Sequence, residues 1–208
     1  MIAQRHPCLL VEDIVARRGD ELIFTYSRYE VADPGFQAMA PRSTILRVRA
    51  RDVTPDWLID RFAELRPNEE MAWHSLVEYK GAGFHIPMID FISRPTHSVL
   101  RELVRILATM GFSDHFLLFE TGRSFHGYFP DVIPEQAWRK YLDGLLVLDN
   151  NDGSSVIDRR WVGHAFVRGF AALRWSHNTS RYRAMPHLTS FVDHADNGDV
   201  LSGPKPQV

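Results

Sequence analysis

The chain has 208 residues, of which 45% are hydrophobic and 24% are charged, and its formal net charge is −2. This composition is typical of a globular protein and excludes an intrinsically disordered chain, while the single cysteine, Cys8, excludes a disulfide scaffold and a structural zinc site made of cysteines. No apolar run approaches the roughly 20 residues that span a bilayer and no signal-peptide pattern begins the chain, so we expect a cytoplasmic protein without a membrane partner.

Patterns in the first 80 residues predict two strands and a helix. Glu21–Tyr29 and Arg42–Asp52 alternate apolar with polar side chains, as half-buried strands do. Arg47 and Arg49 belong to the largely basic face of the second strand. A helix is expected over residues 54–65, because a threonine cap is followed by proline at the first helical position.

From residue 84 onward the expected order is strand, helix, strand, strand, helix and strand, followed by a short helix and two more strands. These elements are the strand Phe84–Ser93, the helix 96–110, the strands His115–Glu120 and Ser124–Phe129, the helix that opens at Pro134, the short strand that ends at Asp158, the helix Trp161–Phe170, and the strands near Ala171–Ser176 and Pro186–Val192. Pro87 marks a bulge or an edge in the first of them, and Gly122 belongs to a tight turn. This order favours an α+β fold with a mostly antiparallel sheet backed by helices. It excludes Rossmann and P-loop folds, because the elements do not alternate and no glycine-rich phosphate loop occurs.

Two acids lie at the ends of apolar runs. Asp90 follows Ile86-Pro-Met-Ile, and Asp158 follows Val156-Ile157. Burying a carboxylate is costly unless a metal ion or hydrogen-bond donors satisfy it, so both acids are candidate metal ligands. The alternatives are that Asp90 ends its strand and caps the next helix, and that Asp158 forms a salt bridge with Arg159 or Arg160.

Ser124 and His126 form a second candidate group. They are two residues apart on a predicted strand, so their side chains share one face. That face would coincide with the one that presents Asp90 if the two strands are neighbours. The alternative is a histidine that belongs to the core or to the surface without a function.

The basic residues are unevenly distributed. Residues 159–192 contain six arginines and no acid, so the rest of the chain carries a net charge of −8. Trp161, Trp175 and Tyr182 are interleaved with these arginines, which together are typical of surfaces that bind nucleotides or single strands. The alternative is a solvated basic face.

Four short patterns, in this order, resemble the archaeo-eukaryotic primases and the prokaryotic primase-polymerases. They are the acid in the apolar strand Ile89-Asp90-Phe91, the hairpin Gly122-Arg-Ser124-Phe-His126, the apolar residue before Asp158, and Leu173-Arg174-Trp-Ser176. The resemblance covers roughly residues 84–192. It implies an RRM-like catalytic subdomain over residues 81–195 and an accompanying N-terminal α/β subdomain over residues 1–80. Residues 196–208 are rich in glycine, proline and aspartate, so we expect them to form a flexible tail.

The resemblance also implies an activity, namely metal-dependent transfer of nucleotides to a 3′-hydroxyl on a nucleic-acid template. Asp90 and Asp158 would be catalytic acids that hold Mg²⁺ or Mn²⁺. The residues expected to bind the nucleoside triphosphate are Ser124, His126, Arg174 and Ser176. The residues expected to bind DNA or RNA are Arg47, Arg49, Arg160, Arg168 and Arg181. A partner subunit such as a helicase is expected to assist priming.

One departure from the family pattern bears on this activity. The first motif of the family usually carries two acids at alternate positions, whereas this chain has Asp90-Phe91-Ile92. Loss of one carboxylate weakens a two-metal clamp. The alternative function is therefore a catalytically degenerate primase-like domain that binds nucleotide or nucleic acid within a larger complex.

Two other classes of site fit the sequence poorly. A two-histidine phosphoesterase needs two His-x-Thr/Ser motifs; His187-Leu-Thr189 provides one, but Tyr128 replaces the hydroxyl residue after His126-Gly. A metal site made only of histidines is not indicated, because the ten histidines include no His-x-x-x-His or His-Glu-x-x-His spacing.

Overall fold

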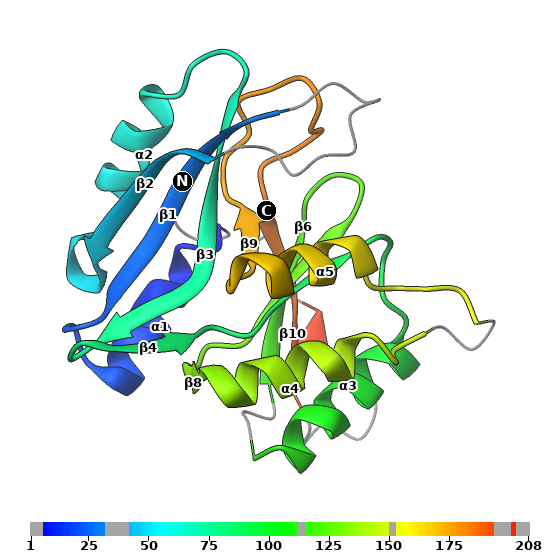
Figure 1. Ribbon diagram of the computed structural model, residues 1–208. Helices are drawn as coiled ribbons and strands as arrows, with labels where there is room; N and C mark the ends of the chain where they lie inside the picture. Colours follow the sequence, from blue (N-terminus) through cyan, green and yellow to red (C-terminus); the bar gives the residue numbers. More distant parts are fainter. Residues whose placement is uncertain (1–5, 32–41, 112–114, 150–152, 194–200, 203–208) are drawn as a thin grey trace.

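The computed structural model describes residues 6–31, 42–111, 115–149, 153–193 and 201–202, and it contains two antiparallel sheets (Figure 1). The first sheet has the order β2 (Arg42–Arg49), β1 (Ile23–Glu30), β3 (Glu69–Tyr79), β4 (Ala82–His85) and β8 (Ile133–Pro134), with β9 (Ala172–Arg174) paired to β3 as well. The second sheet has the order β11 (Leu201–Ser202), β10 (His187–Asp193), β6 (His115–Glu120), β7 (Phe125–Tyr128) and β5 (Met88–Phe91). The predicted α+β fold with antiparallel sheets is confirmed.

The helices are divided between the two sheets. They are α1 (Leu9–Arg18), the short 3-10 helix η1 (Ala50–Asp52), α2 (Pro55–Ala63), α3 (His97–Thr109), α4 (Glu135–Leu145) and α5 (Arg159–Arg168). The side chains of α3, α4 and α5 share one core with the second sheet, and those of α1 share another with the first sheet. Of the helices in the described part of the chain, none combines the length and the apolar character needed to cross a membrane.

The strand predicted over residues 84–93 is two strands, and this prediction was wrong in a way that Pro87 explains. Proline has no backbone N–H and cannot continue the hydrogen-bond ladder of a central strand. The chain leaves the first sheet at His85 and enters the second sheet at Met88, while the carbonyl of Pro87 accepts a bond of 3.0 Å from the N–H of Phe129. Pro87 therefore marks the passage between the two sheets.

The second sheet is buried on both faces. Along β5, Ile89 and Phe91 pack into the core that contains α3, α4 and α5, whereas Met88 packs into the core that contains α1 and the first sheet. Successive side chains of a strand point to opposite faces, so Asp90 shares the face of Met88. An acid thus lies on the side of the sheet that faces the first sheet.

The strand β3 lies between β1 and β4 and also pairs with β9. Its neighbour β9 comes from residues 172–174, so the first sheet includes strands from both sides of residue 80. The division into subdomains at residues 1–80 and 81–195 stays a prediction. The predicted tail over residues 196–208 lies outside the described residues apart from β11, which pairs with β10.

Candidate functional site

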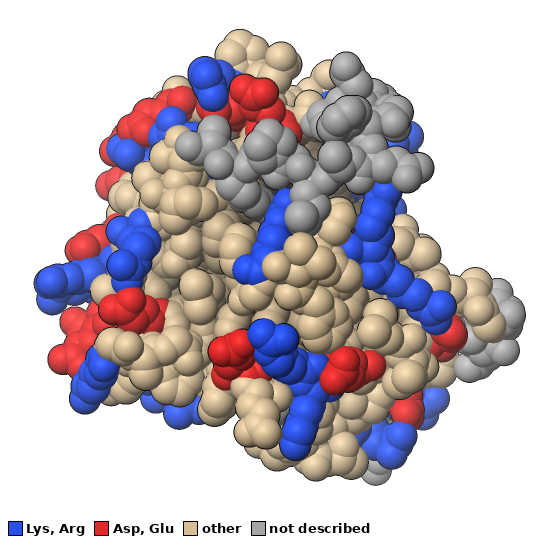
Figure 2. Space-filling view, in the orientation of Figure 1, with Lys and Arg blue, Asp and Glu red and all other residues tan. Residues whose placement is uncertain are grey.

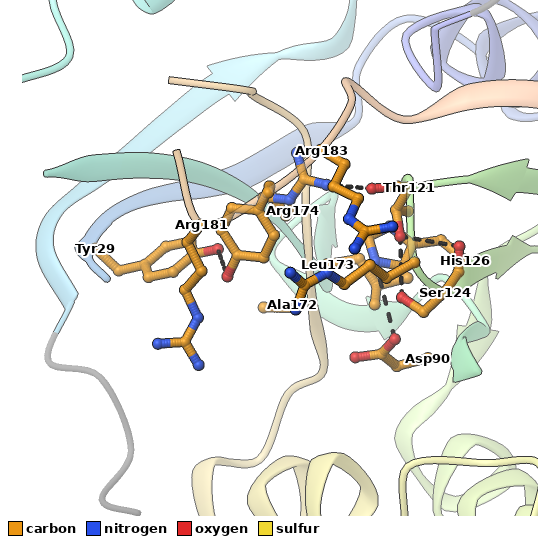
Figure 3. Close-up of a pocket in the computed structure, with 12 residues that line it drawn as sticks. Tyr29, Asp90, Thr121, Ser124, His126, Ala172, Leu173, Arg174, Arg181 and Arg183 are labelled. Atoms are coloured by element: carbon orange, nitrogen blue, oxygen red, sulfur yellow. Dashed lines mark hydrogen bonds and ion pairs between the residues drawn. The ribbon is translucent and has the colours of Figure 1, made fainter. Parts of the chain in front are cut away.

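A pocket of about 310 Å³ lies where the end of β1, the strands β5 and β9, and the turn between β6 and β7 meet (Figure 3). Its lining residues are Tyr29, Asp90, Thr121, Arg123, Ser124, His126, Ala172, Leu173, Arg174, Arg181, Tyr182 and Arg183. Six of the residues that the sequence singled out are among them: Asp90, Ser124, His126, Arg174, Arg181 and Tyr182. The pocket therefore gathers residues that lie up to 154 positions apart between Tyr29 and Arg183.

Asp90 provides the carboxyl group of this pocket. It lies opposite His126 in the β5–β7 pairing, and 26% of its side chain is exposed. Burial and, to a smaller extent, the negative charge of Asp158 raise the pKa of Asp90 to about 8, against the opposing effect of the positive charge of Arg174. A carboxyl group with this pKa is suited to receive a cation, because a cation would restore its ionised form.

Asp158 lies beside Asp90 at the start of α5. Its N–H donates to the carbonyl of Asp90 over 2.9 Å. Its Oδ1 atom accepts from the N–H groups of Arg160 and Trp161, at 2.9 and 3.0 Å, and so caps the helix. Arg159 pairs with Asp149 rather than with Asp158. The structure thus shows a helix cap in place of the alternative salt bridge, with one carboxylate oxygen, Oδ2, outside the capping bonds.

Ser124 and His126 lie on the same side of the pocket as Asp90 (Figure 3). The Ser124 hydroxyl is hydrogen-bonded to the Thr121 hydroxyl at 2.9 Å. The Nε2 atom of His126 lies 3.9 Å from Oδ1 of Asp90, and the buried Nδ1 has no hydrogen-bond partner among the described residues. Burial, with a smaller contribution from Arg174, holds the pKa of His126 well below its usual value, so the ring is neutral at pH 7.

Arg174 is 6% exposed and ties three parts of the pocket together. Its guanidinium donates to the carbonyls of Ser176, Thr121 and Ala184, the last two at 3.2 and 3.0 Å. The same group lies 4.1 Å from the centre of the Tyr182 ring. The side chain therefore brings a fixed positive charge to the pocket while most of its donors are occupied by main-chain carbonyls.

The turn between β6 and β7 touches the segment that carries Arg183. Gly122 has a φ of +97°, and a Cβ atom at this position would lie 2.8 Å from Cβ of Arg183 and 3.0 Å from N of Ala184. No side chain fits in that space, and a positive φ is itself unfavourable for other residues. Gly122 therefore permits the close approach that places Arg183 over the turn.

Replacing Gly122 by alanine is expected to lower the free energy of unfolding by about 1–3 kcal/mol, because a steric overlap with Arg183 and Ala184 adds to the backbone strain. Urea denaturation measures the change. Gly81→Ala is the matched control, since Gly81 has a φ of +78° and nothing within 4 Å of its Cβ position. Equal losses in the two variants would show that the contact with Arg183 has no role.

Sequence reasoning missed several residues of the pocket. Tyr29, Thr121, Arg123 and Arg183 line it and were not singled out. Tyr29 and Tyr182 place their hydroxyl groups 3.4 Å apart, and burial raises the pKa of Tyr29 well above its usual value. Arg123 could have been predicted, because it directly precedes Ser124 in the sequence. For the others, contacts between distant segments decide the position.

Ser176, Arg47 and Arg49 lie outside the lining of this pocket. The Ser176 hydroxyl is 1% exposed and is bonded within the core, where it accepts from the N–H of Met71 at 2.7 Å. Arg47 pairs with Glu78, and Arg49 lines a second pocket of about 410 Å³ that also contains acids. In register these arginines face Thr25 and Ile23, at the other end of β1 from Tyr29.

Arg160 and Arg168 lie on α5 rather than in the pocket. Figure 2 shows lysine and arginine side chains gathered over β9 and α5 on this face, whereas acids and bases alternate over β1 to β4. Burial lowers the pKa of Arg168 from its usual value. The helix that begins with Asp158 therefore continues the positive charge of the pocket along the surface.

Of the two predicted metal ligands, Asp90 lines the pocket, whereas Asp158 lies beside Asp90 and outside the lining. No group of three or more His, Cys, Asp or Glu side chains suited to a metal ion occurs within the described ranges. Ile92, at the position where the related first motif has its second acid, is 50% exposed. Asp90 and Asp158 nevertheless fit the usual protein share of a Mg²⁺ site, because this ion commonly takes one or two carboxylates and completes its shell with phosphates and water. The raised pKa of Asp90 beside Asp158 agrees with such a donor pair.

A family model described as "AEP-like: Archaeo-eukaryotic primase 1D-like" matches residues 49–187, about two thirds of the chain. The chain belongs to this family. The matched region contains every lining residue of the pocket except Tyr29, so the AEP-like region and the site coincide. The predicted membership of the primase superfamily is confirmed. Comparison with curated proteins and with solved structures gave no match.

Proposed function

We propose that this AEP-like chain is a nucleotidyltransferase that adds nucleotides to a 3′-hydroxyl on a nucleic-acid template. The observation that carries the proposal is the pocket itself, in which Asp90 lies with Ser124 and His126 among arginines. Family membership supports the same class of protein. The volume of the pocket, about 310 Å³, is at the lower end of the range of small-molecule sites.

The arginines suit the triphosphate of an incoming nucleotide. Arg123 and Arg183 line the pocket, and neither has an ion pair with an acid of the described chain. A guanidinium binds phosphate oxygens through two parallel hydrogen bonds. Neutral His126 and the hydroxyl of Ser124 add uncharged donors. In phosphoryl chemistry, such positioning and charge stabilisation supply most of the rate enhancement.

Asp90 and Asp158 would hold Mg²⁺ or Mn²⁺ together with the phosphates of the substrate. Such an ion lowers the pKa of an attacking hydroxyl and stabilises the leaving pyrophosphate. The chain's own contribution is to keep the two carboxyl groups adjacent, through the bond from the N–H of Asp158 to the carbonyl of Asp90. Because one Asp158 oxygen caps α5, the helix also fixes the orientation of that carboxylate.

The template would follow the positive surface that leaves the pocket. Arg181 lines the pocket, and Arg160 and Arg168 lie on α5. Contacts of arginine with the phosphate backbone are independent of sequence and weaken with salt. Arg47 and Arg49 lie at the other end of β1, so we expect a smaller contribution from them. A partner subunit such as a helicase would deliver the template.

Extension of a labelled primer on a template, with Mg²⁺ or Mn²⁺ and nucleoside triphosphates, tests this function. We expect template-dependent incorporation that stops when the divalent ion is chelated. Binding of the template in a gel shift, with no incorporation under either ion, would contradict nucleotidyl transfer and favour the second candidate below.

The second candidate is a primase-like domain that binds nucleotide or nucleic acid without catalysis. It is favoured by Ile92, which leaves the first motif with one acid, and by the lack of a three-ligand group in the described residues. In that case the pocket would keep its arginines as a binding surface. Nucleotide binding without turnover is the property that separates this candidate from the first.

Replacing Ile92 by aspartate tests how much the missing acid limits the site. We expect the Mn²⁺ concentration for half-maximal incorporation to fall by about tenfold, because an added carboxylate raises affinity for a divalent ion. Ile92→Asn is the control, since asparagine is similar in shape and polar but uncharged. An unchanged Mn²⁺ requirement in the aspartate variant would show that residue 92 lies outside the ion's reach.

A further inference from the structure

Glu70 is a fully buried acid on β3 that does not line the pocket. Four donors converge on its carboxylate: the N–H and the hydroxyl of Thr179, both at 2.8 Å, the N–H of Asn178 at 3.0 Å, and the hydroxyl of Ser176. Hydrogen bonds to an ionised acceptor are about twice as strong as neutral ones. The buried carboxylate of Glu70 therefore fixes residues 176–179, the segment that directly follows β9.

We name residues 178–184 the strap. The strap is irregular chain between β9 and β10, so no helix or sheet ladder holds it in place. Its first residue, Asn178, also donates through Nδ2 to the carbonyls of Arg66 and Glu69, at 2.6 and 3.0 Å. Its last residue, Ala184, accepts from Arg174. Polar bonds at both ends thus determine where the strap lies.

The strap carries Arg181, Tyr182 and Arg183 into the lining of the pocket (Figure 3). Tyr182 packs against the guanidinium of Arg174, and Arg183 lies against Gly122. Both arginines of the strap are exposed, and the partly buried polar bonds lie at the ends of the strap. Any loosening at residues 178–179 would therefore move these arginines relative to Asp90.

We propose that Glu70 is a positioning residue that holds the strap so that Arg181 and Arg183 grip the polyphosphate part of a ligand. The proposal rests on the proposed function, because it assigns the ligand of the same pocket. Glu70 would act without touching the ligand, through its bonds to Asn178 and Thr179. Its removal should weaken the binding of triphosphates more than that of monophosphates, since only the longer chain reaches both arginines.

The experiment compares Glu70→Gln with Glu69→Gln in the full chain. Glu69 is the adjacent residue of β3 and is also buried, but its carboxylate accepts from the N–H and the guanidinium of Arg66. The main-chain carbonyl of residue 69, which accepts from Asn178, is kept in Glu69→Gln. Thr179→Val provides a milder variant that removes one donor to Glu70 and keeps the shape of the side chain. Affinity for inorganic tripolyphosphate and for a nucleoside monophosphate is measured by calorimetry. The rate of tryptic cleavage after Arg181 and Arg183 is measured by mass spectrometry.

We expect Glu70→Gln to weaken tripolyphosphate binding about tenfold, which is the effect of losing one charge-assisted hydrogen bond. Tryptic cleavage in the strap should become faster, and monophosphate affinity should change less. Thr179→Val should shift both quantities in the same direction, and Glu69→Gln should shift neither. If Glu70→Gln does not fold, Thr179→Val decides the question alone.

Two results would overturn the proposal in distinguishable ways. Wild-type protein that binds neither tripolyphosphate nor nucleoside triphosphates would refute the proposed function and, with it, the ligand assigned to the strap. Wild-type binding that is unchanged in Glu70→Gln and Thr179→Val would refute the positioning role alone. Equal losses for triphosphate and monophosphate would show that Glu70 stabilises the fold and has no specific effect on the strap.

Discussion

Asp90→Asn is expected to reduce nucleotide incorporation at least about a thousandfold, because it removes a carboxylate that we propose holds the divalent ion, at the place where charge would develop during phosphoryl transfer. Asparagine keeps the size of the side chain and its place opposite His126. Single-turnover primer extension measures the effect. Asp143→Asn, at an exposed position on α4, is the control for loss of one negative charge. Full activity in the Asp90 variant would exclude this residue from catalysis.

The same substitution is expected to stabilise the ligand-free protein. Burial and the charge of Asp158 raise the pKa of Asp90 from 3.8 to about 8, so the folded chain binds a proton that the unfolded chain releases between these values. The wild-type stability therefore falls as the pH rises from about 4 to 8, and asparagine removes that dependence. Near pH 7 we expect a gain of roughly 2–4 kcal/mol, equivalent to about 5–10 °C in Tm.

Thermal denaturation at pH 4, 6 and 8 measures this difference between the two proteins. Wild type and Asp90→Asn should have similar Tm values near pH 4, and the variant should be the more stable one at pH 8. A difference that stays constant with pH would contradict the raised pKa.

The second large effect is expected at Asp158, where two roles must be separated. Near pH 5, where Asp90 is protonated in the folded form of each protein, Asp158→Ser should keep the stability of wild type, since serine caps a helix about as well as aspartate, whereas Asp158→Ala should lose about 1 kcal/mol. Both variants should lose incorporation by about a hundredfold or more if Asp158 also holds the metal ion. Primer extension and urea denaturation on the same samples give both quantities.

If Asp158→Ser retains primer extension, and Asp158→Ala loses stability, Asp158 acts only as the cap of α5. A further readout is available in the absence of substrate. Removal of the Asp158 charge should lower the pKa of Asp90, because that charge contributes to raising it. The fall of stability with rising pH should then end at a lower pH in Asp158→Ser than in wild type.

Part of the site could be predicted because local patterns determine it. His126 is on β7, and antiparallel pairing of β5 with β7 brings Asp90 opposite it. Ser124 was expected on the same strand; it lies in the turn just before β7 and still lines the pocket. The threonine cap at residue 54 and the proline after it predicted the start of α2. These features depend on neighbours in sequence or on one strand pairing.

Other parts depend on contacts between distant residues. The strand β3 was not predicted, because Glu69, Glu70 and His74 read as polar positions although all three are buried. Glu70 is buried because donors more than 100 residues away satisfy it, and no local pattern shows them. Arg47 and Arg49 had a suitable pattern, but register placed them at the far end of β1.

The acid and the arginines of the pocket are held in place by different interactions. Asp90 belongs to a sheet that is packed on both faces, and such strands open only when much of the domain unfolds. The arginines of the strap depend instead on polar bonds to Glu70 and Arg174. The acid side of the site is thus held by hydrophobic packing, whereas the basic side is held by charged hydrogen bonds. We therefore expect the loss of a single donor or acceptor to displace the arginines and to leave the carboxyl groups in place.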